Sequence, residues 1–340
     1  MITFDEIKEQ PKELERVSEK YAVLSREVVD FLRKANSSEI DFVGCGTSYS
    51  LAMGLSFQVN RLSDGRISSR YFSGSEVALG LRKLDKNAMI VGLSRSGEST
   101  ETIQALERAK NDYGLKTVGI TCEPGSKLTK VADVSSVLDF INERSVVMTK
   151  SFTSMAFLFS AMIRDIFKPN VLESYLRNIP KIGNSVLENS ERLFKEVDFS
   201  KYDHFAFLGY DEYLASAMEG VIKVTETSLS DVNAFQTLEY RHGPKSKVGE
   251  KSLICIFASD LVHSEEEKMA QEIKSLGGTV VNVSSKKMNV SHNLFTPYNV
   301  GDFGDWFLRV IPAQIIGVEV AKVKRLNPDS PKNLTRVVKL

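Results

Sequence analysis

Short runs of apolar and β-branched residues alternate with longer segments of helical periodicity along this chain. In the first half the runs are IDFVG (40–44), AMIVGLS (88–94), KTVGIT (116–121) and SSVLDF (135–140). Each is followed by a turn rich in glycine, serine or threonine and, in most cases, by an apolar-periodic segment. Uninterrupted apolar strands between helices are typical of a parallel sheet that is buried on both faces. The pattern therefore predicts an α/β fold.

The same series occurs again in the second half of the chain. Its runs are FAFLG (205–209), KSLICIF (251–257), GTVVNVS (278–284) and a weaker FTPYNV (295–300). A shift of 165 residues pairs Phe42 with Phe207, Gly44 with Gly209, Ala52 with Ala217 and Met53 with Met218. Repeated order together with these identities predicts two α/β domains of one topology, each a parallel sheet with helices on both faces.

The flanks of the two domains have patterns of their own. Residues 5–34 carry apolar side chains at helical spacing among charges, which predicts an amphipathic helix. Two prolines, Pro328 and Pro331, predict an extended C-terminal tail. We therefore expect a helical arm at 1–35, a first domain at 36–170, a second domain with a preceding helical linker at 171–325, and a tail at 326–340.

Composition excludes several classes of partner. Lys plus Arg and Asp plus Glu both number 44, without long runs of one sign, which argues against nucleic acid. No apolar run approaches the ~18 residues of a membrane span, and the first residues do not resemble a secretory signal. The three cysteines lie far apart without a CxxC pair, which is typical of reduced thiols and not of a zinc site. We expect a cytoplasmic protein without a metal.

Small hydroxyl residues follow two neighbouring strands of the first half. Thr47 and Ser48 come after the first run, and Ser94, Ser96 and Ser99 after the second. Such turns at the carboxyl ends of parallel strands suit a phosphate, because hydroxyls and helix N-termini favour an anion. The same residues also serve as helix caps, and that interpretation stays open for a single turn. Ala258-Ser259-Asp260 in the second half lacks the cluster, so one phosphate site per chain is expected.

Nucleotide chemistry is not indicated, because a Walker loop is absent and no GxGxxG follows the first strand. No cofactor is expected. In the second half, Glu219, Lys223 and Glu226 share one face of a predicted helix, either as a solvated charged face or as part of a site. His242 lies in a loop before Gly243-Pro244, and a carboxylate with an imidazole is a common pair for proton transfer. His204, His263 and His292 are interpreted as structural.

GCGTS, SRSGEST, ExxxKxxE, HGP and a terminal DxPxNL, in this order from about residue 40, resemble the sugar isomerase (SIS) domain family. Within it the chain is most similar to the isomerase half of glucosamine-6-phosphate synthase and to its stand-alone relatives, the glucosamine-6-phosphate deaminases. The resemblance implies two flavodoxin-like SIS domains and a phosphorylated ketose or amino sugar as substrate. It also implies a homodimer, because in similar enzymes the neighbouring subunit contributes the histidine of the HGP motif.

The resemblance assigns residues by motif. Glu226 matches the glutamate that moves a proton between sugar C1 and C2, Lys223 a nearby active-site lysine, and His242 the histidine of ring opening. The residues implied to bind phosphate or substrate are Cys45, Gly46, Thr47, Ser48, Ser94, Arg95, Ser96, Ser99 and Val146.

The chain departs from the synthase pattern at three places. It starts Met1-Ile2-Thr3 without the glutaminase cysteine, so glutamine is not expected as an ammonia source in cis. Arg95 stands where the synthase has glutamine, either as a phosphate contact or facing solvent. Arg336 stands where the synthase has its imine-forming lysine, and arginine does not form that imine. We expect Arg336 to contact the sugar or to balance the charge of Glu226; the alternative is a surface cation on a loose terminus.

These features predict an isomerase-deaminase that converts glucosamine 6-phosphate to fructose 6-phosphate and ammonia. Deglycation of a fructosamine 6-phosphate and isomerisation of another sugar phosphate are the alternatives on the same scaffold. A non-catalytic phosphosugar sensor is the alternative of another class, although a sensor would need only the phosphate-binding turns and not Glu226 and His242.

Overall fold

A computed structural model of the protein describes residues 1–35, 37–297 and 300–336. The chain forms two compact units, each assembled from separate stretches. The N-terminal unit comprises Lys12–Arg144, Lys150–Arg177 and Thr335–Leu340, and the C-terminal unit comprises Met1–Pro11, Ser145–Thr149 and Asn178–Leu334. The division of the chain at residues 35, 170 and 325 stays a prediction.

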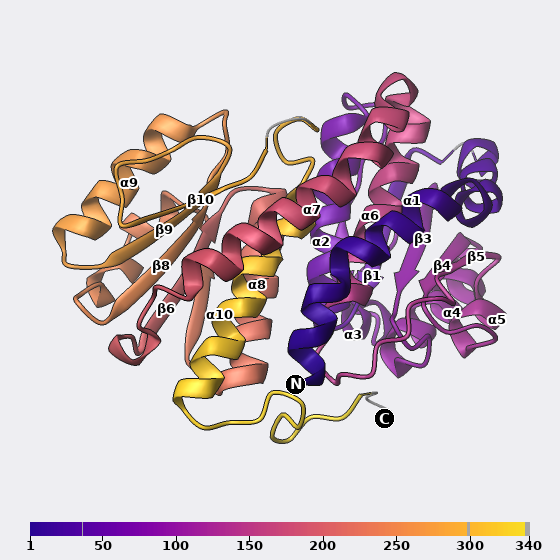
Figure 1. The fold of residues 1–340 in the computed structure, drawn as a ribbon. Coiled ribbons are helices and arrows are strands. Elements are labelled where there is room, and N and C mark those ends of the chain that lie inside the picture. The colour runs from indigo at the N-terminus through magenta and orange to yellow at the C-terminus, as the bar shows by residue number, and fades with distance from the viewer. Residues whose placement is uncertain (36, 298–299, 337–340) are drawn as a thin grey trace. The chain divides into compact units, whose positions relative to one another are not determined.

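The N-terminal unit contains a five-stranded parallel sheet in the order β2-β1-β3-β4-β5 (Figure 1). Its strands are β1 (Glu39–Gly44), β2 (Tyr71–Ser73), β3 (Ala88–Leu93), β4 (Lys116–Thr121) and β5 (Val134–Val137). The connecting helices are α2 (Thr47–Leu62), α3 (Gly74–Ala78), α4 (Thr100–Tyr113), α5 (Lys127–Val131) and α6 (Lys150–Phe167). This is the order of flavodoxin-like folds.

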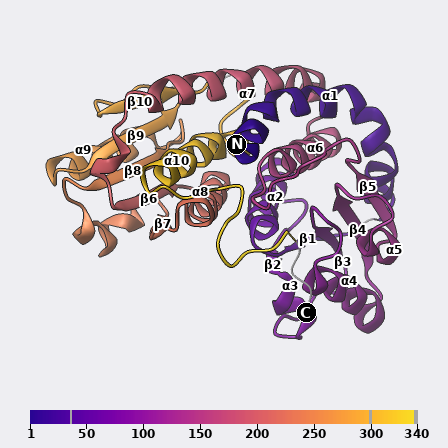
Figure 2. The ribbon, with the colours of Figure 1, turned by 60° about the horizontal axis from the view of Figure 1, so that its bottom comes forward.

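Helices cover both faces of this sheet, as Figure 2 shows from a second direction. Val43 and Ile90 belong to one buried cluster with Leu106 of α4 and Leu128 of α5. The neighbouring Phe42 points to the opposite face, where its ring meets Phe159 of α6 edge-on with centroids 5.2 Å apart. Alternate residues of one strand thus enter two different layers, which explains why most residues of the central strands are apolar.

The C-terminal unit repeats this topology in the order β10-β9-β8-β6-β7, again with parallel strands. The strands are β6 (His204–Gly209), β7 (Val232–Phe235), β8 (Ser252–Phe257), β9 (Thr279–Ser284) and β10 (His292–Phe295). Its helices are α7 (Leu172–Phe194), whose first turns belong to the N-terminal unit, α8 (Glu212–Ser228), α9 (His263–Ser275) and α10 (Val310–Val323). Short 3-10 helices are η1 (Pro169–Val171), η2 (Phe199–Lys201), η3 (Glu239–Arg241), η4 (Pro244–Lys247) and η5 (Trp306–Arg309). The predicted α/β class with two flavodoxin-like domains is confirmed.

The 165-residue repeat is also visible in the close contacts of its glycines. A Cβ at Gly44 would lie 2.3 Å from the carbonyl oxygen of Ser48, and a Cβ at Gly209 would lie 2.7 Å from that of Tyr213. Both glycines end the first strand of their sheet, and both contacts reach the first turn of the following helix. Glycine is required at these two positions because the strand end and the helix approach each other closely.

Helix α1 (Ile2–Ala35) confirms the predicted amphipathic helix and begins earlier than expected. The amides of Ile2 and Thr3 donate to the two carboxylate oxygens of Asp329 at 2.9 and 2.7 Å. These contacts satisfy two of the amides that a helix start leaves without a partner. Asp329 belongs to the predicted tail, of which residues 337–340 lie outside the described residues, and from Asn327 to Arg336 the tail has turns and irregular backbone.

The sequence did not predict β2 and β7, which have only three and four residues. The strand predicted at 295–300 is wrong in position, since β10 ends at Phe295, while Tyr298 and Asn299 lie outside the described residues. Within the residues that the structure describes, none of the helices has the length and hydropathy needed to cross a bilayer.

Candidate functional site

The turn after β3 brings the predicted serines together. The hydroxyls of Ser94 and Ser99 lie 3.1 Å apart, and the Gly97 amide donates to Ser94 Oγ at 3.1 Å. Ser96 Oγ accepts from the Glu98 amide at 3.2 Å. Ser94 is buried, whereas Ser96 and Ser99 are half-buried. The turn therefore gathers three hydroxyls at the carboxyl end of β3, where a parallel sheet binds its ligands.

Helix capping does not account for this cluster. Ser99 occupies the N-cap position of α4, yet its side chain makes no capping hydrogen bond. An N-cap serine ordinarily accepts from an amide two or three residues on. The orientation of Ser99 toward Ser94 thus favours the ligand-binding interpretation over the structural one for this turn.

The turn at the end of the neighbouring β1 has the second pair of hydroxyls. Gly46 has a φ of 56° at the N-cap of α2, and Thr47 and Ser48 begin that helix as buried residues. Because β1 and β3 are adjacent in the sheet, the two turns lie at the same edge. Burial raises the pKa of the half-buried Cys45 thiol, which is 3.7 Å from Thr102 Oγ1, so we interpret Cys45 as a neutral side chain of this turn.

Gly97 fixes the shape of the serine turn. Its φ is 61°, and a Cβ there would lie 2.1 Å from the Ser126 hydroxyl. The Gly97 carbonyl accepts from the Leu128 amide at 3.0 Å. The turn is therefore packed against the start of α5, and its hydroxyls are held in place before a ligand binds.

Arg95 is buried and paired, so the possibility that it faces solvent is excluded. Its guanidinium lies 2.8 Å from the Glu143 carboxylate, with 7% and 1% of the two side chains exposed. Glu143 also accepts from the amide and the hydroxyl of Ser151. The second guanidinium nitrogen of Arg95 donates to the Arg336 carbonyl at 3.1 Å. Arg95 thus links the serine turn to the C-terminal residues of the same unit.

A cavity of about 300 Å³ lies beside this ion pair. Its walls include Arg95, Ser96, Cys122, Glu143 and Arg336, all from the N-terminal unit. Ser96 therefore belongs both to the serine turn and to a hollow large enough for several ligand atoms. Val146, the remaining residue implied to bind substrate, is half-buried and lies in the C-terminal unit.

In the C-terminal unit, helix α8 brings Lys223 between two carboxylates. The Lys223 ammonium is 3.3 Å from Glu219 and 2.8 Å from Glu226. Glu219 is fully buried and Lys223 is 1% exposed, whereas Glu226 keeps 24% of its side chain exposed. Burial by itself would lower the pKa of Lys223, but Glu219 and Glu226 outweigh it, and the pKa is raised. A solvated charged face is therefore excluded for this helix.

His242 is the C-cap residue that follows the 3-10 helix η3, and it is exposed. Gly243, with a φ of 123°, turns the chain into η4. His204 differs, because its Nδ1 lies 3.0 Å from the Ser252 hydroxyl and burial lowers its pKa. The exposure of His242 suits a residue that acts on a ligand or on a second chain.

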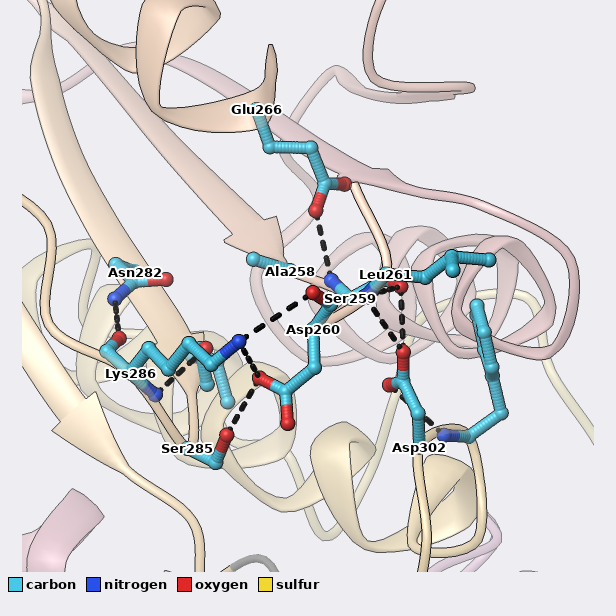
Figure 3. A network of polar contacts seen from close by, with 12 residues as sticks. Ala258, Ser259, Asp260, Leu261, Glu266, Asn282, Ser285, Lys286 and Asp302 are labelled. Atoms are coloured by element: carbon cyan, nitrogen blue, oxygen red, sulfur yellow. Dashed lines mark hydrogen bonds and ion pairs between the residues drawn. The ribbon is translucent and has the colours of Figure 1, made fainter. Parts of the chain in front are cut away.

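The edge of the C-terminal unit that corresponds to the serine turn is acidic (Figure 3). Ser285 Oγ donates to Asp260 at 2.6 Å, and Lys286 Nζ lies 3.8 Å from the same carboxylate. Glu266 of α9 is fully buried and accepts from the Ser259 amide at 2.7 Å and from Thr237 Oγ1 at 2.8 Å. This edge therefore differs in charge from the serine turn.

Glu266 predicts a pH dependence of stability. Burial raises the pKa of its carboxyl from 4.5 to about 7, so the folded protein favours the protonated form. The stabilisation that comes from the protonated carboxyl is fully present below pH 4.5 and is lost as the pH rises through 7. Between pH 5 and pH 8 we expect the free energy of unfolding of the wild type to fall by on the order of 3 kcal/mol relative to that of Glu266→Gln. Urea unfolding of both proteins across this range measures the difference, and parallel curves would contradict it.

The structure gathers the hydroxyl residues in the N-terminal unit and the Lys223–Glu226 pair in the C-terminal unit. Two partners of these groups were not assigned a role from the sequence. Glu143 is 48 residues from Arg95 and follows no periodic pattern. Glu219 was visible in the helical spacing, but only its burial distinguishes it from a surface charge. Among the described residues, no cluster of three or more His, Cys, Asp or Glu side chains is arranged to hold a metal.

Comparison with known proteins identifies relatives of this chain. The SIS domain family matches residues 32–164. A glutamine–fructose-6-phosphate aminotransferase (isomerizing) of Nostoc sp. (strain PCC 9229) is 29% identical over 325 residues, which cover 88% of this chain and 51% of that protein. The chain thus spans about half the length of the curated relatives that it matches.

Solved structures extend the similarity to the whole chain. A glucosamine-6-phosphate deaminase from Thermotoga maritima is 30% identical, with a TM-score of 0.82 and complete coverage of both chains. A tagatose-6-phosphate ketose/aldose isomerase from Escherichia coli has a TM-score of 0.85 at 20% identity, covering 98% of this chain and 96% of that one. The second comparison concerns the fold alone.

Proposed function

Because this chain belongs to the sugar isomerase (SIS) domain family, we propose that it is a phosphosugar isomerase-deaminase. Its proposed reaction converts glucosamine 6-phosphate and water to fructose 6-phosphate and ammonia. The N-terminal unit binds the phosphate through its two hydroxyl turns, and the C-terminal unit supplies the proton-transfer group.

The arrangement of Lys223 supports this proposal most directly. An ammonium between two carboxylates keeps its proton, so Lys223 is not the nucleophile of a protein-bound imine. Glu226 is the more exposed of the two carboxylates, and an exposed carboxylate can accept a proton from a substrate carbon. A phosphosugar sensor has no need for such a group.

The proposed steps use the chemistry of the substrate. His242 assists the opening of the sugar ring to the aldehyde. Glu226 takes the proton from C2, which the neighbouring carbonyl makes acidic, and returns a proton to C1. The nitrogen already on C2 then forms an imine within the substrate, and water adds to C2 as ammonia leaves. The sum is one water consumed and one ammonia released.

This order of steps requires no imine-forming lysine in the C-terminal tail. Arg336, at the position of that lysine in the synthase, stays protonated. Its carbonyl is held by Arg95, and the residue lines the same cavity as Ser96. We propose that Arg336 contacts the bound sugar phosphate from this position.

The exposed His242 is consistent with a homodimer in which this residue completes the neighbouring subunit's site, and the dimer stays a prediction, as does the cytoplasmic location. Sedimentation of the purified chain, with and without fructose 6-phosphate, would measure the oligomeric state.

The assay that tests the proposed reaction is ammonia release on mixing with glucosamine 6-phosphate. Release of ammonia and fructose 6-phosphate in equal amounts supports a deaminase. An amino acid released from a fructosamine 6-phosphate, without ammonia from glucosamine 6-phosphate, would favour the deglycase alternative. Binding of both sugars without turnover would favour a sensor.

We expect Ser96→Ala to weaken the binding of fructose 6-phosphate while leaving the fold intact. A charge-assisted hydrogen bond contributes roughly 1.5–3 kcal/mol, so the affinity should fall about tenfold to a hundredfold. Calorimetric titration with fructose 6-phosphate measures the affinity of this variant and of the control Ser264→Ala, which changes an exposed serine of α9. Equal affinities of Ser96→Ala and the wild type would contradict the assignment of the phosphate to this turn.

A further inference from the structure

The two units carry the same turn after the first strand of the sheet. Gly46, which follows β1, has φ 56° and ψ −124°, and Asp211, which follows β6, has φ 46° and ψ −118°. Asp211 lies 165 residues after Gly46, as the sequence repeat requires. The backbone of this turn is thus preserved, although a glycine has been replaced by an aspartate.

The turns after β3 and β8 correspond as well. Leu93 pairs with Ile120, and Phe257 pairs with Val283, at the same register of the two sheets. The next amide donates to the partner strand at 3.1 Å in both units, from Ser94 in one and from Ala258 in the other. Ser259 therefore begins a turn that is equivalent in position to the serine turn.

In the C-terminal unit, Ser259 and Leu261 of this edge both donate to one side chain, Asp302 (Figure 3). One of its carboxylate oxygens accepts from Ser259 Oγ at 2.6 Å and from the Leu261 amide at 3.1 Å. The other lies 3.1 Å from the Tyr213 hydroxyl, whose single proton is shared with Asp305 at 3.0 Å, and 3.1 Å from the Phe303 amide. Hydrogen-bond donors thus surround both carboxylate oxygens, as they would surround a bound oxyanion.

We infer that the C-terminal unit contains a second oxyanion site, equivalent in position to the serine turn, and that the chain's own Asp302 carboxylate occupies it. Tyr213 stands 165 residues after Ser48, so both units have a hydroxyl residue at this position of the helix that follows the first strand. The inference rests on the proposed phosphate site of the N-terminal unit: its counterpart in the second unit holds a side chain of the protein in place of a ligand.

The charges around Asp302 indicate what ligand could replace it. Arg309 pairs with Asp305 at 3.2 Å, and Lys286 faces Asp260. Burial raises the pKa of Glu266, the other acid of this edge, to about 7. Both cations therefore already face an aspartate, and Asp211 adds another carboxylate to this edge. A small monovalent carboxylate like that of Asp302 fits this arrangement, whereas a phosphate dianion would add an uncompensated charge.

The test removes the internal carboxylate and supplies one in solution. Thermal unfolding of the full chain carrying Asp302→Ala is measured in sodium formate and in sodium chloride of equal concentration. We expect formate to raise the unfolding temperature of this variant by roughly 2–4 °C relative to chloride, and to leave the wild type unchanged. The double variant Asp302→Ala, Ser259→Ala should lose the response because it lacks one of the donors.

Several results of this experiment would overturn the inference. A formate response of the same size in the wild type or in the double variant would overturn the inference, as would no response in Asp302→Ala. Should Asp302→Ala fail to fold, the yield of refolded protein in formate and in chloride replaces the unfolding temperature, and equal yields would overturn it. Asp302→Asn, whose amide still fills the site, should show no response. None of these readouts depends on turnover or on the proposed reaction.

Discussion

Glu226→Gln should reduce the turnover of glucosamine 6-phosphate by roughly 10²–10⁴-fold, the range for the loss of a general base. An amide cannot accept the C2 proton, so exchange of the C2 hydrogen with deuterium in the solvent should stop as well. The fold should persist, because Lys223 keeps the buried Glu219 as its partner at 3.3 Å. Ammonia release and deuterium incorporation, followed by mass spectrometry, are the two measurements.

The matched control is Glu188→Gln, the same chemical change at an exposed position of α7. It should turn over at the wild-type rate. The binding of fructose 6-phosphate to Glu226→Gln should also stay close to that of the wild type. Deuterium exchange at the wild-type rate in Glu226→Gln would mean that another group is the base and that the assignment by motif is wrong.

Glu143→Ala should have the largest effect on stability. It leaves the Arg95 guanidinium, 7% exposed, without the carboxylate that neutralises it. Breaking a buried ion pair from one side typically costs about 3–5 kcal/mol, because a buried charge stays uncompensated. The variant also removes the acceptor of the Ser151 amide and hydroxyl. Urea unfolding followed by circular dichroism measures the change in the free energy of unfolding.

An exposed pair provides the comparison. Arg241 and Glu272 lie 2.7 Å apart, with 27% and 37% of their side chains exposed. We expect Glu272→Ala to cost no more than about 1 kcal/mol. The double variant Arg95→Leu, Glu143→Leu should be more stable than Glu143→Ala, because both charges are removed together. A loss below 1 kcal/mol for Glu143→Ala would show that Arg95 finds compensation elsewhere.

Most of the strands of this fold can be predicted from the local sequence. The strands β1, β3, β4, β6, β8 and β9 are mostly apolar runs that are buried on both faces, so their composition indicates them in the sequence. The edge strands β2 and β7 have one neighbour each and partly buried residues, and their sequences YFS and VNAF carry little periodic signal. Their pairing with β1 and β6 is a tertiary effect that a window of sequence does not contain.

The residues of the candidate site likewise include some that the sequence predicts and some that only the folded structure shows. The hydroxyl residues follow strands at short spacing and were visible as a cluster, as were Lys223 and Glu226 on one helical face. The partner of Arg95 was not visible in the sequence, because Glu143 lies in a segment without regular secondary structure. Asp302 is 43 residues from Ser259, and only the folded chain brings its carboxylate to that turn.

The capping of α1 by Asp329 affects the order in which this protein can fold during synthesis. The amide of Thr3 and its acceptor are separated by 326 residues. At the usual 5–20 residues per second, a ribosome needs roughly 16–65 s to make that length of chain. The first amides of α1 therefore lack this acceptor while the strands of the N-terminal unit are made, and the C-terminal unit, which holds residues 1–11, can close only after Asp329 has been made.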